Sequence, residues 1–422
     1  MNYVNTASWK YILPAISILL LLGSQAAVAQ QLPLDSILTR IDGNNRLLRS
    51  YAQKAEGYRH SADAATAWMA PMAGVGTFMT PYPGQMIMDG RDKGSLMLQL
   101  EQDIPNPAKL QARKRYIASQ GNAETAARGV TLNELRAQAR KLYYSWVISE
   151  RKQQVLRRNE KIMRMMLEIE KLRYPYNQSQ LGNSFKAEAR LEENANMLRM
   201  EEGAVIKSRS WLNSLMNQPG MTEFTVDTTW EPQFTPAAGH DTASIAEARY
   251  DIRKMEENIR TMQLGIRSMQ AEKKPDFRIR LDHMVPLDKA MPKAYSVMGM
   301  LSIPIAPWSR GMYRSEIKSM EQNIAAMENE RSAMLQETQG MLYGMQAEIR
   351  QMDRRITSME TVIIPSLRKA LDAGFAAYQE NRLQLPAVID AWEALTMTEA
   401  GVLDEKLKRY EMIVEYEKAL YR

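Results

Sequence analysis

The amino-acid sequence predicts a mainly α-helical chain with a small β-sheet portion, in which one structural unit occurs twice. Three observations lead to this fold class. Long segments carry apolar residues at heptad spacing, which is typical of coiled coils. Two pairs of short segments alternate between apolar and polar residues, which is typical of strands. Short motifs of the first half recur in the second half at a constant offset, which indicates an internal duplication.

The longest regular segment runs from about Trp308 to Leu371 and has one apolar seam. Its phase slips by four residues between Met341 and Met345, and such a stutter locally unwinds a supercoil. Charged and amide side chains separate the seam residues, so we expect a helix that packs against a neighbour. The segment 252–269 repeats the pattern. The seam residues are Ile317, Met320, Ile324, Met327, Met334, Met341, Met345, Ile349, Met352, Ile356, Met359 and Ile363.

The composition argues against several classes of function. The formal charge of +6 is spread along the predicted helices, so nucleic acid is not an expected partner. The absence of cysteine excludes disulfides, thiolate zinc sites and a lipid-anchoring cysteine. The three histidines are far apart in sequence, and no nucleophile constellation, phosphate loop or metal triad occurs. We therefore expect no enzyme activity and no cofactor.

Residues 1–29 are predicted to be a secretory signal peptide. Lys10 precedes an apolar run, and Ala27-Val28-Ala29 supplies the small residues that a signal peptidase needs, so the mature chain is expected to start at Gln30. No later segment has the roughly 18 consecutive apolar residues of a membrane-spanning helix. If the exported chain crosses a membrane, it must do so with strands.

The remaining chain is predicted to contain two repeats of helix, two strands, long helix, break and helix. The predicted parts are a first repeat at 30–216, an inter-repeat region at 217–243 rich in Pro, Gly and Thr, and a second repeat at 244–422. The predicted strands are 72–79, 95–104, 276–284 and 295–303. The predicted helices include 33–70, 107–172, 244–271 and 308–371, with breaks at 174–183 and 381–386.

The strands leave two interpretations open. Strict alternation over about 9 to 11 residues suits a lipid-facing strand of a membrane β-barrel, and it also suits an amphipathic sheet of a soluble domain. Four strands cannot close a barrel, and open edges are not tolerated in lipid, so several chains would have to contribute. Two chains would give eight strands and three would give twelve with room for a pore, which favours a trimer.

The polar face of the third strand carries Arg278, Arg280 and Asp282, which are expected to face the lumen of such a barrel. Repeated in every subunit, Arg278 and Arg280 would make the lumen locally positive and help anions to pass. The alternative is that the two arginines pair with Asp282 and with other acidic side chains nearby.

With these features, the sequence resembles the TolC family of outer-membrane efflux proteins over essentially all of the mature chain. The resemblance rests on the duplication, on Ile-Pro at the close of each second strand, and on paired tip motifs. The tip motifs are Tyr174-x-x-Asn177 followed by Ala187, and Tyr378-x-x-Asn381 followed by Ala391. Asn replaces the family's Gly in both motifs, and Asn also tolerates the left-handed conformation.

The resemblance implies a homotrimer in the outer membrane of a Gram-negative bacterium. Its twelve-stranded barrel would have four strands from each chain, and its long coiled-coil α-barrel would extend into the periplasm with residues 217–243 in a belt around it. The tips would dock on a periplasmic adaptor that is bound to an inner-membrane pump of the RND type. The expected function is a passive exit duct for small molecules or metal ions. The alternatives are the exit duct of a type I protein-secretion system and a soluble periplasmic coiled-coil scaffold.

The resemblance also assigns roles to residues at the tips. Asp390 matches an acidic position that rings the narrow end of the tunnel, whereas its counterpart in the first repeat is Lys186. A second acidic position of the family holds Ala387 here, which weakens the gate assignment of Asp390. Tyr378 either locks the closed tip through its hydroxyl or packs between helices. The other candidates are Tyr174, Asn177 and Asn381 in the tip motifs, and Arg382, which lies near the family's basic tip position.

Methionine is frequent in the seam, and the chain contains 31 of these residues. Because thioethers are soft ligands for Cu(I), a ladder of them suits a copper or silver exporter. The alternative is that Met fills the seam as Leu would and gives a flexible contact between helices. The Met residues share the seam with Ile, which favours packing. The residues in question are Met320, Met327, Met352 and Met359.

Overall fold

The computed structural model describes residues 31–176, 180–237, 239, 241–302 and 307–421, so the predicted signal peptide lies outside the described residues. The chain forms two compact units. The first contains the segment up to Asn45 together with Leu135–Pro236 and Met345–Glu417, and the second contains Arg46–Glu134, Ala237–Gly344 and the C-terminal residues. Each unit therefore takes segments from both predicted repeats, and the repeat boundaries themselves stay a prediction.

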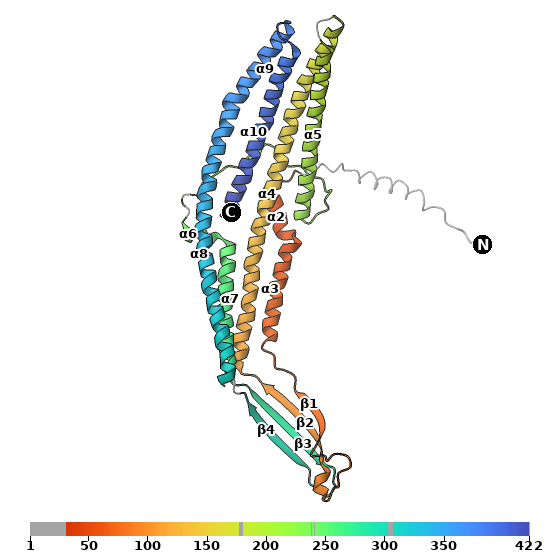
Figure 1. Ribbon diagram of the computed structural model, residues 1–422, viewed down its shortest axis with the longest axis vertical. Helices are drawn as coiled ribbons and strands as arrows, with labels where there is room; N and C mark the ends of the chain where they lie inside the picture. The colour runs from red at the N-terminus through yellow and green to blue at the C-terminus, as the bar shows by residue number, and fades with distance from the viewer. Residues whose placement is uncertain (1–30, 177–179, 238, 240, 303–306, 422) are drawn as a thin grey trace, which may run out of the picture. The chain divides into compact units, whose positions relative to one another are not determined.

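The predicted order of elements occurs twice along the chain (Figure 1). The first half contains α2 (Leu34–Asn44), α3 (Arg46–Ala64), β1 (Met72–Phe78), η1 (Gly90–Lys93), β2 (Ser95–Ile104), α4 (Pro107–Arg173), η2 (Tyr174–Tyr176) and α5 (Leu181–Leu215). The second half contains α6 (Thr242–Ala248), α7 (Tyr250–Glu272), β3 (Phe277–Pro286), β4 (Ala294–Leu301), α8 (Pro307–Ser358), η3 (Met359–Ile363), α9 (Ile364–Gln379) and α10 (Leu385–Ala419). No described helix is both long and apolar enough to span a membrane.

Two predicted helices are each divided by a single residue with extended backbone. Asn45 separates α2 from α3, and its side-chain Nδ2 donates a 3.0 Å hydrogen bond to the carbonyl of Leu215. Arg249 separates α6 from α7, where its guanidinium forms a bidentate pair with Asp251 and donates to the carbonyl of Ala419. Both side chains are buried. Hydrogen bonds to residues distant in sequence hold these turns, and hydrophobic periodicity cannot predict such bonds.

The four strands form one antiparallel sheet in the order β1-β2-β3-β4. Leu98 of β2 pairs with Val75 of β1 and with His283 of β3, which pairs in turn with Tyr295 of β4. Strand β2 begins and ends where the sequence predicts. Because side chains alternate between faces, this register places the apolar residues of neighbouring strands on one face. The large apolar residues of this face, all 40–77% exposed, are Val75, Leu96, Leu98, Leu100, Phe277, Ile279, Leu281, Tyr295, Val297 and Leu301.

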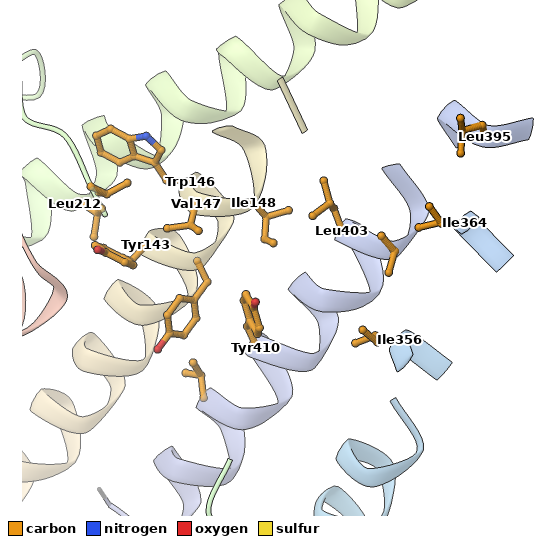
Figure 2. Packing of buried hydrophobic residues seen from close by; sticks show 14 of the residues in the cluster. Tyr143, Trp146, Val147, Ile148, Leu212, Ile356, Ile364, Leu395, Leu403 and Tyr410 are labelled. Atoms are coloured by element: carbon orange, nitrogen blue, oxygen red, sulfur yellow. The ribbon is translucent and has the colours of Figure 1, made fainter. Parts of the chain in front are cut away.

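The core of the first unit lies along the second half of α4. Figure 2 shows side chains of α4 directed towards Leu212 of α5 and towards Tyr410 of α10. Aromatic contacts reinforce this core, with the rings of Tyr144 and Tyr410 5.5 Å apart and those of Trp146 and Phe224 5.0 Å apart. Burying each large apolar side chain contributes about 1.5–3 kcal/mol, so this cluster is the main source of stability that packs α4, α5 and α10 together.

The buried face of α8 differs from the predicted seam around Met341. Leu335 and Leu342 are 9% and 0% exposed, whereas Met341 is 44% exposed. The four-residue phase slip therefore lies between Arg331 and Leu335 and not after Met341. At this point Nη2 of Arg331 pairs with Oε1 of Glu256 on α7 at 2.8 Å. An ion pair in the seam gives no hydropathy signal, which is why the periodicity placed the stutter too late.

The helix that begins with α8 continues past Pro365 to the end of α9. Proline lacks an N–H group, and its ring would clash with the carbonyl four residues earlier. The π-helical turn η3 precedes Pro365, and within it the N–H of Ile364 donates to the carbonyl of Met359, five residues back. Such a π-turn shifts the hydrogen-bond ladder by one residue and lets the chain pass the proline without a break.

Candidate functional site

The turn between α9 and α10 is a Schellman motif, a helix end closed by a left-handed residue. Asn381 has φ 59°, its N–H donates to the carbonyl of Tyr378, and the N–H of Arg382 donates to the carbonyl of Ala377. These two bonds satisfy carbonyls that a helix end leaves free. Asn381 thus has the left-handed conformation that Asn, like Gly, tolerates. Its counterpart, Asn177, lies outside the described residues.

The side chain of Tyr378 is buried near the end of α9 and binds a carboxylate. Its hydroxyl donates a 2.6 Å hydrogen bond to Oε2 of Glu170 on α4, and Nδ2 of Asn183 on α5 donates to Oε1 of the same carboxylate at 3.2 Å. Tyr378 and Glu170 are 3% and 1% exposed. Burial raises the pKa of the Tyr378 phenol above its ordinary value, and the nearby Glu170 carboxylate raises that pKa further. Hydrogen bonding and packing, the two alternatives for Tyr378, occur together.

Arg173 joins the end of α4 to the end of α9. Its guanidinium carbon lies 4.4 Å from the centre of the Tyr378 ring, and its Nη1 and Nη2 donate to the carbonyls of Tyr378 and Gln379 at 3.0 and 3.1 Å. A cation at a helix C-terminus interacts favourably with the helix dipole as well as with the free carbonyls. Arg173 therefore holds the last turn of α9 against α4.

Sequence reasoning missed Glu170, Arg173 and Asn183, although one signal was available. Buried residues of α4 recur at heptad spacing from Leu156 through Met163 to Met166, and Glu170 takes the next position of that seam. A carboxylate at an apolar seam position requires a buried partner. The partners themselves come from α9 and α5 and are visible only in the folded chain.

The predicted tip residues Lys186 and Asp390 form an ion pair with each other. Nζ of Lys186 on α5 lies 3.3 Å from Oδ1 of Asp390 on α10, and both side chains are largely solvent-accessible. Within the chain the Asp390 charge is therefore balanced by its repeat-one counterpart. Nε of Arg382 lies 3.1 Å from Oε2 of its near neighbour Glu380, and Tyr174 is 46% exposed. The fold thus gathers Tyr378, Lys186 and Asp390 near the helix turns but leaves Tyr174 and Arg382 at the surface.

On the polar face of the sheet, the arginines are paired. Arg278 contacts Asp103 at 2.5 Å and Glu101 at 2.7 Å, and Nε of Arg280 lies 2.9 Å from Oδ1 of Asp282. These five charged side chains contain two arginines and three carboxylates, so the cluster does not make this face positive. The structure therefore shows the second alternative of the sequence analysis, in which the arginines pair with acidic side chains. The antiparallel register favours this pairing, because it sets Arg278 opposite Asp103 and Arg280 opposite Glu101.

The four seam methionines lie in apolar helix contacts or beside them. Met352 is 5% exposed, and Met359 packs against the core cluster. A methyl group added at Gly265 on α7 would lie 3.3 Å from the ring of Tyr116 and 3.7 Å from Sδ of Met320, so the ring and the thioether together fill the space beside that glycine. Met327 is half-buried. Among the described residues, no group of three His, Cys, Asp or Glu side chains is arranged to hold a metal ion.

Neither a family model nor a curated protein matches this sequence significantly. Solved structures do match. The Neisseria gonorrhoeae MtrE outer-membrane channel in its open state has 16% identity and a TM-score of 0.71, with 92% of this chain and 88% of that chain covered. The Vibrio cholerae outer-membrane protein VceC has 14% identity and a TM-score of 0.70, with 92% and 95% covered. CusC, described as forming a transmembrane channel, has 15% identity and a TM-score of 0.74, with 92% and 91% covered.

The likeness extends over nearly the whole chain and confirms the predicted fold class. The protein has the TolC-type fold of these channels, a mainly helical chain with a small four-stranded antiparallel sheet.

Proposed function

We propose that the protein is the outer-membrane channel subunit of a tripartite efflux system, a passive exit duct for small molecules or metal ions. The apolar face of the sheet carries the proposal. Leu98, Ile279 and Val297 lie on this face and are 48%, 48% and 63% exposed. An exposed apolar surface of this extent marks a contact with lipid or protein. Together with a fold matched by outer-membrane channels, it supports a lipid-facing role.

The edges of the sheet support a homotrimer. Among the residues that the structure describes, β1 pairs only with β2 and β4 only with β3, so the described sheet has two open edges. Open edges are not tolerated in lipid, and closure with further copies of the same sheet removes them. Three copies give a barrel of twelve strands, wide enough for a pore, with the polar face and its Arg278 and Arg280 clusters directed to the lumen.

The turn between α4 and α5 supports an adaptor as partner. Leu172, Tyr176 and Phe185 lie near this turn and are 71%, 77% and 61% exposed. Bulky apolar side chains at a helix turn in water favour a protein contact. We assign this contact to a periplasmic adaptor, which would connect the duct to an inner-membrane pump of the RND type that supplies the energy.

Closure of the duct is assigned to the contacts at the end of α9. Tyr378 binds α9 to α4 through a buried hydrogen bond to the Glu170 carboxylate, and Arg173 adds bonds to two carbonyls at the end of α9. Opening would require α9 to leave α4, which breaks these bonds, so they favour the closed duct. The chain itself performs no covalent chemistry in this proposal.

Two alternatives remain in view. An exit duct for a type I protein-secretion system would have the same fold, and it would differ from an efflux duct in its cargo. A soluble periplasmic scaffold is disfavoured, because ten large apolar side chains of one sheet face would then lie in water.

The experiment is planar-bilayer conductance of the detergent-purified protein, with its mass determined in the same detergent. We expect a trimer that passes small currents in its closed state. A water-soluble, non-conducting monomer or dimer would contradict the proposal and favour the scaffold.

A further inference from the structure

A buried carboxylate on α10 binds two other helices. Glu399 is 5% exposed; its Oε2 lies 2.7 Å from Nη2 of Arg158 on α4, and its Oε1 lies 2.7 Å from Nη2 of Arg368 on α9. Asn159 also directs its Nδ2 to Oε2 at 3.4 Å. A buried charge of this kind is tolerated only when it is paired and hydrogen-bonded, so each of the two arginines satisfies one of its oxygens.

Helix α10 is bound to α4 along much of its length, whereas α9 has few polar bonds to the other helices. The α10 side chains Glu399, Asp404, Glu415 and Glu417 each form an ion pair with α4, to Arg158, Lys152, Lys141 and Arg140 respectively. In α9, the described side chains that make polar bonds to another helix are Arg368 and Tyr378. Arg368 lies ten residues before Tyr378, or about 15 Å along the helix.

The start of α9 differs from a regular helix. In the π-turn η3 a backbone N–H donates to the carbonyl five residues back instead of four, and Pro365 has no N–H to donate. Bends in long helices concentrate at such places. In this turn Val362 and Ile363 are 59% and 42% exposed, whereas Met359 packs against the core cluster and Glu360 pairs with Lys406 of α10 at 2.7 Å. Helix α9 therefore begins at an irregular turn that is anchored to α10, and polar bonds hold it at two points beyond this turn.

We propose that the ion pair between Arg368 and Glu399 is a second lock of the duct, which holds α9 in the closed position from its middle while Tyr378 holds its end. The turn η3 with Pro365 is the hinge about which α9 moves. This inference rests on the proposed function, because a lock on α9 has a role only in a duct that opens. It assigns Arg368 as a positioning residue that acts through Glu399.

The chain contains no cysteine, so a single introduced thiol reports on α9 directly. Leu371 on α9 is 4% exposed, and Val402 on α10 is 5% exposed. Maleimide labelling of a Leu371→Cys trimer in detergent is measured in three backgrounds, unaltered, Arg368→Gln and Glu393→Gln. Glu393 is the matched control, because it pairs at 2.8 Å with Arg190 and so joins α10 to α5 without touching α9.

We expect labelling at position 371 to become about tenfold faster with Arg368→Gln, the loss expected for one charge-assisted hydrogen bond, and to stay unchanged with Glu393→Gln. The Val402→Cys protein should label at the same slow rate in all backgrounds. Equal rates at position 371 in the three backgrounds would overturn the inference. Parallel acceleration at position 402 would also overturn it, because the substitution would then loosen the whole bundle.

Conductance of the same proteins separates this inference from the proposed function. A conducting trimer whose current rises with Arg368→Gln, and rises further when Tyr378→Phe is added, supports the inference that both contacts hold α9. If current rises with Tyr378→Phe and not with Arg368→Gln, the result supports the proposed duct and contradicts the second lock. A protein that conducts in no background overturns the proposed function, and the second lock with it.

Discussion

The hydroxyl of Tyr378 donates a 2.6 Å hydrogen bond to Oε2 of Glu170, so that the end of α9 is bound to α4 through a buried carboxylate. The two residues lie 208 positions apart and belong to different predicted repeats. Their counterparts are not equivalent, since Tyr174 is half-exposed. In the proposed duct, each chain would thus hold its tip closed through one asymmetric contact, which single substitutions can test.

Tyr378→Phe removes the hydroxyl and keeps the ring. Because the buried Glu170 carboxylate loses a donor, we expect the free energy of unfolding to fall by about 1–3 kcal/mol and the conductance of the purified channel to rise. Tyr174→Phe is the matched control and should change neither quantity. Unchanged conductance of Tyr378→Phe, with the trimer intact, would show that the hydrogen bond does not hold the duct closed.

Asp390→Ala and Lys186→Ala test the exposed ion pair between α5 and α10. Exposed pairs of this kind contribute about 0–1 kcal/mol, so neither substitution should reduce thermal stability measurably. If Asp390 lines the closed end of the duct, its replacement should raise cation conductance, and replacement of Lys186 should leave the carboxylate unpaired and increase cation selectivity. Identical currents and blocker sensitivity in both variants and the unaltered protein would remove Asp390 from the pore.

Leu98→Arg tests the apolar face of the sheet. A lipid-facing arginine costs about 2–4 kcal/mol near the membrane midplane, so we expect this variant to fail in membrane assembly. Met97→Arg alters the adjacent residue, which points to the opposite face, and should assemble normally. Membrane fractionation followed by detergent extraction measures both. Equal assembly of the two variants would mean that the apolar face does not meet lipid.

Replacement of Met320, Met327, Met352 and Met359 by Leu tests whether the seam packs or binds metal. Exchange of Met for Leu conserves volume and usually costs less than about 1.5 kcal/mol per site, so the trimer and its conductance should be retained. Tolerance of copper and silver in cells that depend on this channel is the second readout. A selective loss of that tolerance with an intact trimer would contradict the packing interpretation.

Asn381→Ala and Asn381→Gly test the left-handed turn after α9. Alanine in this conformation costs about 1–2 kcal/mol, whereas glycine adopts it freely. We therefore expect denaturant unfolding of Asn381→Ala at lower concentration than the unaltered protein and of Asn381→Gly at a similar or higher one. A reversed order would mean that the Asn side chain, and not the backbone angle, stabilises the turn.

Much of the fold was open to prediction from local pattern. Heptad spacing identified the long helices, and alternation identified the strands, with β2 placed at Ser95–Ile104 as observed. Asn381 was expected in a left-handed turn, and it has φ 59°. These features depend on residues close in sequence, for which backbone preference and burial of one face decide the outcome.

The contacts of the candidate site were not predictable in the same way. Glu170, Arg173 and Glu399 are polar residues in helical segments, and sequence alone does not distinguish a buried charge with distant partners from a solvated one. The pairing of Arg278 with Asp103 likewise required the register of β2 and β3, whose strands come from different halves of the chain.

The sequence by itself thus determined the helices, the strands, the duplicated order of elements and the apolar face of the sheet, because hydrophobic periodicity and turn chemistry act locally. Only the tertiary structure decided which charges meet, where the α8 seam changes phase beside Arg331, and how η3 carries the helix past Pro365. The reason is physical. A charge in the interior is stabilised only by the partner that folding brings within hydrogen-bond distance, and that partner can lie anywhere in the chain.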